Sequence, residues 1–273
     1  AHIPWERHTG RMAVVPLPVQ RARAFILVFG SSLLSGLALV TFSASSRYLV
    51  DALGLTSEAF GRIFLSQLVF AVLGGLLGGR LTMAIGPRAT LGLVLLCQAS
   101  AMTSLWCATE IREGYELLLA ATALYGFSFG ISGSPWSVYP PALFPTAKSS
   151  AIASVYTVFG VGLTLGPLFV RACVSVGRWP VVPLSIGAGA LTGVLLLRVT
   201  RMPDAEAEAP ASRRSPPDRV GLTLFLVAAL FYATIEASIG NWAVAFLTGE
   251  QGLLVEDAAI ALACFFGTFT GAR

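Results

Sequence analysis

The chain has 273 residues, of which 55% are hydrophobic and 12% are charged, and its net charge is +4. Soluble domains carry about 25% charged residues, so this composition excludes an ordinary soluble enzyme domain. The basic residues lie at the ends of long apolar segments, which indicates topology signals and argues against a nucleic-acid partner.

Residues 1–23 are predicted to form a basic cytoplasmic tail, and apolar segments of about 20 residues follow it. A helix of that length crosses the hydrocarbon core of a bilayer, and a soluble α/β protein does not hold eight such runs. We therefore expect an all-α, polytopic membrane protein whose partner is the lipid bilayer. Its spans are expected at residues 25–45, 59–81, 88–108, 115–138, 149–171, 180–199, 220–247 and 255–272.

The distribution of Lys and Arg predicts the orientation of the chain. With the N-terminus in the cytoplasm, the inner segments hold 13 of these residues and the outer segments hold 5. Because basic residues are enriched in cytoplasmic loops, we expect a cytoplasmic N-terminus and a location in the plasma membrane (the inner membrane of a bacterium).

A hydrophilic segment rich in Pro, Ala and charge covers residues 201–219 and is predicted to be a cytoplasmic linker. Residues 24–200 before it would form a six-helix bundle, and residues 220–273 after it would form two further helices. A linker after six spans is typical of a transporter that is built from two helical bundles.

Glycine pairs at equivalent places support two related halves. The second span ends with Gly74-x-x-x-Gly78, and the eighth ends with Gly267-x-x-x-Gly271. Parallel halves related by an axis along the membrane normal predict such a match. We therefore expect a six-helix N-terminal half plus the first two helices of an incomplete C-terminal bundle, in a C-terminally truncated protein that is a monomer when full length.

Neither the cysteines nor the glycines indicate a metal or cofactor site. The cysteines lie in or beside apolar runs without a CxxC spacing and are predicted to be small packing residues. The glycine pairs follow no predicted strand, so they are expected to let helices approach closely rather than to bind a nucleotide. These residues are Cys97, Cys107, Cys173 and Cys264, and Gly74/Gly78, Gly126/Gly130, Gly162/Gly166 and Gly189/Gly193.

The loop after the second predicted span resembles a motif of the major facilitator superfamily, G-x-L-A-D-R-x-G-R-K. Here residues 79–88 read GRLTMAIGPR, in which an acid and an arginine of the motif are replaced. In that family the loop is implied to latch the two halves during conformational change. The matching residues, which the resemblance assigns to this conformational loop, are Gly79, Leu81, Gly86 and Arg88.

Two further stretches resemble the fucose-permease-like sugar branch of this superfamily. One runs from Leu143-Phe144-Pro145 into the glycines of 160–167, and the other is the segment 236–242. The glycine stretch is also similar to the antiporter motif of drug exporters. The resemblance implies a secondary active or facilitative transporter that moves a small polar solute, a sugar being one candidate, by alternating access.

Glu236 is the only acidic residue placed well inside a predicted span. A charge at the membrane centre costs about 2.5–3.5 kcal/mol, so such a residue usually faces a cavity or a partner. Its helical neighbours Tyr232, Ala233, Gly240 and Ala243 are mostly small, which indicates a packed or cavity-facing side. We predict a substrate-binding or protonatable carboxyl, and the alternative is a structural carboxyl bonded to a neighbouring helix.

Asn241 and Trp242 lie five and six residues after Glu236, so a straight helix would turn them away from it. A break at Gly240 would bring all three side chains to one cavity, as in the discontinuous helices of other transport sites. The alternative for Trp242 is a position at the lipid interface.

The fourth predicted span carries hydroxyl and aromatic side chains at i, i+3 and i+4 spacing. Such a face suits a sugar, whose rings have apolar faces and polar edges, and helix packing is the alternative. The fifth span continues the theme. The candidate substrate residues in these spans are Tyr125, Ser128, Ser132, Trp136, Tyr139 and Tyr156.

Other functions stay open beside transport of a polar solute. A drug or metabolite exporter of the same superfamily, or a non-transporting sensor built on the same fold, would have a similar sequence. The proton-coupled members of the sugar branch are implied to carry carboxylates in helices one and four, which this chain lacks, so uniport and coupling through Glu236 both remain. An intramembrane enzyme needs clustered catalytic groups, and Glu236 stands alone, so we expect no enzyme activity.

Overall fold

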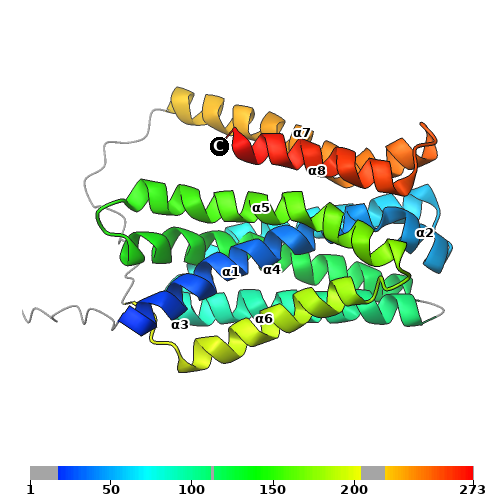
Figure 1. Cartoon of the computed structure of the whole chain (residues 1–273). Helices are drawn as coiled ribbons and strands as arrows, with labels where there is room; N and C mark the ends of the chain where they lie inside the picture. Colours follow the sequence, from blue (N-terminus) through cyan, green and yellow to red (C-terminus); the bar gives the residue numbers. More distant parts are fainter. Residues whose placement is uncertain (1–17, 112–113, 204–218, 273) are drawn as a thin grey trace, which may run out of the picture.

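The computed structural model describes residues 18–111, 114–203 and 219–272, and these residues form helices joined by turns, without a strand. The prediction of an all-α chain is confirmed for this part of the protein. In chain order the helices are α1 (Pro18–Ala44), α2 (Ser46–Leu53), α3 (Ser57–Glu110), α4 (Tyr115–Leu143), α5 (Lys148–Ser175), α6 (Val181–Val199), α7 (Arg219–Gly249) and α8 (Val255–Gly271) (Figure 1).

The helices up to α6 form one bundle, and α7 and α8 lie together along one side of it (Figure 1). Within the bundle α1 lies between α5 and α6, and α3 packs along α4. The contact between the two parts is made mainly by α8 on α5 and by α7 on α1. We call the end of the bundle that holds α2 the α2 end, and the opposite end, where α1 begins, the linker end.

Six helices in the described ranges are long and apolar enough to cross a membrane, namely α1, α3, α4, α5, α6 and α7. Helix α8 has 17 residues, which is the lower limit for a crossing. Apolar side chains on the first part of α3, among them Leu65, Val72 and Leu76, are exposed on the outside of the bundle. A bilayer is the solvent that tolerates such a surface, because its hydrocarbon core is as apolar as these side chains.

Helix α3 has 54 residues and contains two spans that fold back on each other. The turn lies at Gly86, whose φ of 83° and ψ of 156° are not helical. A positive φ is the conformation that glycine adopts without steric cost, and Pro87 after it has no N–H to leave unpaired. The hydroxyls of Thr82 and Thr90 on either side of the turn lie 3.3 Å apart. This hairpin agrees with the separate spans predicted at 59–81 and 88–108.

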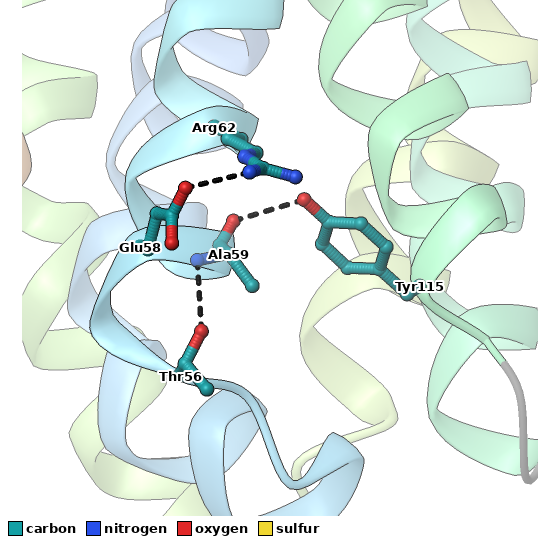
Figure 2. Close-up of polar contacts among 5 residues, drawn as sticks. All are labelled: Thr56, Glu58, Ala59, Arg62 and Tyr115. Carbon is teal, nitrogen blue, oxygen red and sulfur yellow. Dashed lines mark hydrogen bonds and ion pairs between the residues drawn. The ribbon is translucent and has the colours of Figure 1, made fainter.

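The beginning of α3 is fixed at the α2 end by local hydrogen bonds (Figure 2). The Thr56 hydroxyl caps the helix and accepts from the Ala59 amide at 3.2 Å. The Tyr115 hydroxyl, at the start of α4, donates to the Ala59 carbonyl oxygen at 3.1 Å. An ion pair one turn apart joins Glu58 to Arg62 on the exposed side. These contacts set the position of the α3 segment that follows, which carries Gln67.

The bundle of α1 to α6, in which α3 supplies two spans, is called the six-helix part below. Close backbone contacts at glycines hold it together, as the glycine pairs predict. A methyl group at Gly36 of α1 would overlap the carbonyl oxygen of Phe159 and lie 3.0 Å from the Cα atom of Gly162 on α5. A methyl group at Gly74 of α3 would lie 3.1 Å from the Cα atom of Gly130 on α4. In lipid, where burial of apolar surface contributes little between helices, such contacts are a main source of association.

Candidate functional site

A cavity of about 250 Å³ lies between α7 and α8 on one side and α1, α3, α4 and α5 on the other. Most of its lining is apolar. Its polar lining side chains come from both parts of the protein and are Ser43, Gln67, Glu236 and Asn241.

Helix α7 brings Glu236 and Asn241 to the cavity. Ala233, Ala237 and Gly240 line the cavity beside them, and these positions recur at the spacing of one helix face. Glu236 is half-buried, and its small neighbours leave room for the cavity beside this helix face. Glu236 therefore lies on the side that the sequence predicts to be packed or cavity-facing, and Asn241 lines the same cavity although a straight helix was expected to turn it away.

Gln67 reaches the cavity from the first arm of α3, opposite α7. Its side chain is only 6% exposed, and its Nε2 atom has no hydrogen-bond partner in the protein. The backbone beneath it is fixed, because a side chain at Gly126 of α4 would overlap the Gln67 carbonyl oxygen. Ser43 of α1, by contrast, donates to the Val40 carbonyl oxygen in its own helix at 3.2 Å.

Four phenylalanine rings form the apolar wall of the cavity. Phe64, Phe129 and Phe159 come from the six-helix part, and Phe266 comes from α8. The rings of Phe129 and Phe159 are stacked, with centroids 5.5 Å apart and an interplanar angle of 24°. Such rings offer flat apolar surface to a ligand that is itself a ring.

The charge of the cavity selects among ligands. Glu236 is the only ionisable residue among the described side chains that line it. At low dielectric a carboxylate repels an anion strongly, and no lysine or arginine of this lining would offset that repulsion. The cavity therefore suits a neutral or cationic solute with a polar edge and an apolar face.

Helix α7 is continuous from Arg219 to Gly249, so the expected break at Gly240 is wrong. Glu236 and Asn241 both line the cavity although the helix is unbroken, because the cavity extends far enough around α7 to include both positions. The small residue at 240 serves packing instead, since a methyl group there would lie 3.1 Å from the Cζ atom of Phe266.

Trp242 does not line this cavity. It lines a second pocket of about 160 Å³ nearer the α2 end, together with Phe60 and Ser46. Its ring centroid lies 6.1 Å from the centroids of both Phe60 and Phe64. The aromatic group thus separates the smaller pocket from the larger cavity, and 41% of Trp242 is exposed.

The sequence matches a known family over almost its whole length: residues 24–273 match the Major Facilitator Superfamily. The chain belongs to this superfamily. The predicted helical bundle of the major facilitator type is thereby confirmed, and membership places the protein among integral membrane transporters rather than enzymes.

One curated relative is the "Uncharacterized MFS-type transporter YfiU" of Bacillus subtilis (strain 168), 31% identical over 150 residues. The alignment covers 53% of this chain and 28% of that protein, so the chain matches only part of its relative.

Two solved structures have a similar fold. A crystal structure of a D-xylose-proton symporter has a TM-score of 0.67 at 13% identity and covers 93% of this chain and 67% of that one. The inward-open xylose transporter XylE from E. coli has a TM-score of 0.57 at 14% identity and covers 67% of this chain and 49% of that one. At these identities the likeness shows the fold alone.

The superfamily loop motif lies at the turn of the α3 hairpin. Gly86 is the residue with positive φ, which explains why a glycine stands there. The guanidinium of Arg88 donates to the carbonyl oxygens of Leu197 at 2.6 Å and Arg198 at 3.2 Å, at the C-terminal end of α6. The last carbonyls of a helix lack partners within it, so this contact closes the end of α6.

The other two motif residues lie before this turn. Gly79 is exposed with open space around it, and Leu81 is half-buried, both on the first arm of α3. The contacts of Arg88 described above stay inside the six-helix part. A latch between the halves stays a prediction.

The polar stripe on α4 is buried inside the six-helix part and lines neither pocket described here. The Tyr125 hydroxyl donates to the Ser35 carbonyl oxygen at 2.7 Å, and the Trp136 indole N–H donates to the Ser31 hydroxyl at 3.0 Å. Both bonds join α4 to α1. The geometry favours the alternative of helix packing for these side chains.

The remaining candidates on α4 and α5 are placed in the same way. The Ser128 hydroxyl donates to the Val94 carbonyl oxygen on α3 at 2.8 Å, and the Ser132 hydroxyl donates within α4 at 2.6 Å. Tyr139 is buried, and half-buried Tyr156 packs edge-on against the Trp136 ring at 6.1 Å. A substrate contact for this group stays a prediction.

Sequence reasoning missed Gln67 and the phenylalanine wall. Gln67 had a usable signal, because it is an amide inside an otherwise apolar span. The wall had none, since the chain holds 17 phenylalanines and spacing alone does not tell which of them meet.

Proposed function

We propose that the protein transports a small polar solute, with a neutral sugar as the leading candidate, by alternating access. The observation that carries this proposal is the cavity between the six-helix part and α7/α8, with polar groups from both parts and an aromatic wall. Sugars present hydroxyl edges and apolar ring faces, and this lining offers a partner for each.

The mechanism we propose is rocking of one part against the other around this cavity. The contact between the parts is made by side chains rather than by backbones in direct contact. At the C-terminal end of α8 its Thr270 side chain faces Gly160 of α5, and near the α2 end Arg171 of α5 pairs with Glu256 of α8 at 3.2 Å. Contacts of this kind separate at smaller cost than the glycine contacts inside the six-helix part.

The proposal also covers the membrane in which the protein lies and its orientation there. We propose a plasma (bacterial inner) membrane with the N-terminus in the cytoplasm, which puts the α2 end outside. The excess of basic residues at the linker end supports this orientation. Membership of the fucose-permease-like branch, a second bundle of which α7 and α8 are the first helices, and a monomeric full-length protein stay predictions.

Export of a drug or metabolite is the second candidate, because most of the cavity lining is apolar and Glu236 is the only ionisable side chain among the described lining residues. A lipophilic cation would find a counter-charge and an aromatic wall there. Such a ligand needs no hydrogen bond from the amides of the cavity, whereas a sugar does.

Transport in proteoliposomes tests the proposal. The protein is expressed from its gene with the whole surrounding reading frame, and uptake of labelled D-xylose, other neutral monosaccharides and tetraphenylphosphonium is measured with and without a pH gradient. We expect sugar uptake above that of liposomes without protein, and a dependence on the pH gradient would assign proton coupling. Flux of the cation alone would favour the exporter, and ligand binding without any flux would favour the sensor.

A further inference from the structure

Two buried amide groups in the described part of the chain lack a hydrogen-bond partner at Nε2, those of Gln67 and Gln98. Burying a donor without an acceptor costs desolvation free energy that no hydrogen bond offsets. The presence of each of these two amides inside the protein therefore needs an explanation. Gln98 is fully buried inside the six-helix part, where its Oε1 atom accepts from the Ser35 hydroxyl at 3.5 Å. Gln67 instead lines the cavity, where a rotation of its side chain brings the covered Nε2 atom to a ligand.

The surroundings of Gln67 define what that ligand offers. Across the cavity stand a carboxyl and an amide from α7, Glu236 and Asn241. A hydroxyl group both donates and accepts, so a molecule with several hydroxyls can satisfy an amide donor on one side and a carboxylate acceptor on the other. The stacked rings of Phe129 and Phe159 complete the site with apolar surface.

We propose that Gln67 is the specificity-determining residue of the six-helix part, and that its Nε2 atom donates to a hydroxyl oxygen of a neutral, monosaccharide-sized solute. The same solute reaches Glu236 and Asn241, so it links α3 to α7 across the boundary between the two parts. The proposal rests on the proposed function for the statement that this ligand is also the transported solute.

The chemistry excludes other ligand classes from this interaction. An anion meets the carboxylate of Glu236 without a basic lining residue to offset it. A lipophilic cation that has no oxygen gives Gln67 nothing to donate to, so its binding is independent of this residue. The effect of a substitution at Gln67 on binding affinity therefore distinguishes a hydroxylated ligand from a lipophilic cation.

Equilibrium binding to the purified protein in detergent provides the test. D-xylose, a panel of other neutral monosaccharides and tetraphenylphosphonium are the probes, and ligand-induced thermal stabilisation is titrated for wild type, Gln67→Leu, Gln67→Asn and Gln98→Leu. We expect Gln67→Leu to weaken binding of the preferred monosaccharide by about tenfold or more, which is the loss of one hydrogen bond to a polar ligand. Gln67→Asn should retain part of the affinity, because it keeps the amide.

Gln98→Leu is the matched control, because it also removes an amide whose Nε2 atom has no partner, at a buried site away from the cavity. We expect it to leave sugar affinity unchanged. Without ligand, Gln67→Leu should melt no lower than wild type, since Nε2 makes no bond within the protein. A large loss of unliganded stability would overturn the proposal by assigning Gln67 to the fold.

Three further results would overturn the inference. They are sugar binding to Gln67→Leu at wild-type affinity, equal loss in Gln98→Leu, and a wild-type protein that binds no monosaccharide of the panel. Sugar flux with an unchanged KM in Gln67→Leu refutes this inference and leaves the transport proposal standing. Sugar binding that depends on Gln67 without any flux does the reverse.

Discussion

The interior of the six-helix part and its boundary with α7 and α8 differ in how the helices meet and in what their polar side chains contact. In the interior, Tyr125 and Trp136 bond to α1, and Gly36 lies in backbone contact with α5. At the boundary, Gln67 and Glu236 face a cavity, and the contacts are made by side chains. Polar residues in these membrane spans are thus of two kinds, those that join helices inside the six-helix part and those that line the cavity at its boundary.

This difference teaches how the protein can move. A part whose helices touch through backbones and are joined by hydrogen bonds between helices has one arrangement, because packed interiors resist continuous deformation. A boundary with side-chain contacts and an unpartnered donor loses less interaction free energy when it opens. The comparison predicts that changes in the interior lower stability, whereas changes at the boundary lower transport.

The largest expected effect is that of Gly36→Leu on folding. The side chain would overlap the carbonyl oxygen of Phe159, and neither backbone can yield without separating α1 from α5. Overpacking costs about 1–3 kcal/mol when side chains can adjust, and we expect at least the upper end of that range here. Thermal stability and the monodispersity of the purified protein measure it.

Gly30→Leu is the control for this change. Gly30 lies on the same helix, and a Cβ atom placed there has no heavy atom of a neighbouring helix within 4 Å. We expect near-normal stability from it. If both variants melt alike, α1 and α5 are not locked by backbone contact, and the six-helix part is not the rigid body of the comparison.

Glu236→Gln should have the next largest effect, on transport rather than on stability. A hydrogen bond to a charged group contributes about 1.5–3 kcal/mol, so uptake at low solute concentration should fall more than about tenfold. The melting temperature should change little. Uptake in proteoliposomes and thermal unfolding of the same preparation separate the two outcomes.

The exposed Glu250, just beyond the end of α7, supplies the matched control Glu250→Gln. Equal loss of uptake in both variants would mean that net charge, not a group in the cavity, matters. A large loss of stability in Glu236→Gln alone would favour the structural carboxyl that the sequence left as the alternative.

Trp136→Phe should have a smaller effect, and on stability. It keeps an aromatic ring in the core but removes the N–H that donates to the Ser31 hydroxyl. Hydrogen bonds between membrane helices average about 0.6 kcal/mol, so a modest fall in melting temperature is expected, with uptake retained. Trp242→Phe is the counterpart at the boundary, where the ring is 41% exposed and stability should change less. A selective loss of sugar affinity in Trp136→Phe would show that the polar and aromatic side chains of α4 belong to the binding site.

Much of the fold could be predicted because lipid imposes a simple rule on sequence. A span must be long, apolar and helical, so the apolar runs around 115–138 and 149–171 predict α4 and α5. The turn at Gly86 was visible as a Gly-Pro pair in a motif. These features are local, and local chemistry decides them.

The site was less predictable because it depends on which helix faces meet. Helical spacing puts Tyr125 and Trp136 on one face, but it does not tell whether that face meets α1 or a cavity. Glu236 was found since a lone carboxyl in a span needs a special environment. Gln67 has a similar need at lower cost, and only the placement of α7 opposite α3 shows that it faces the same space.

The smallest expected effect is that of Arg171→Gln, which removes an ion pair across the boundary. Arg171 and Glu256 lie 3.2 Å apart, and their side chains are 38% and 55% exposed. Exposed pairs contribute less than about 1 kcal/mol and are screened by salt, so the melting temperature should fall slightly at low salt and not at high salt. Arg62→Gln, which breaks a pair inside α3, serves as the control.

The effect on transport decides what Arg171→Gln means for the comparison. Because the pair joins α5 to α8, its loss favours separation of the two parts at the α2 end, whereas the pair of Arg62 bridges no boundary. Uptake kinetics should therefore change in Arg171→Gln and stay constant in Arg62→Gln. If neither variant alters the kinetics, the parts do not separate at the α2 end during transport, and the rocking motion must open the boundary elsewhere.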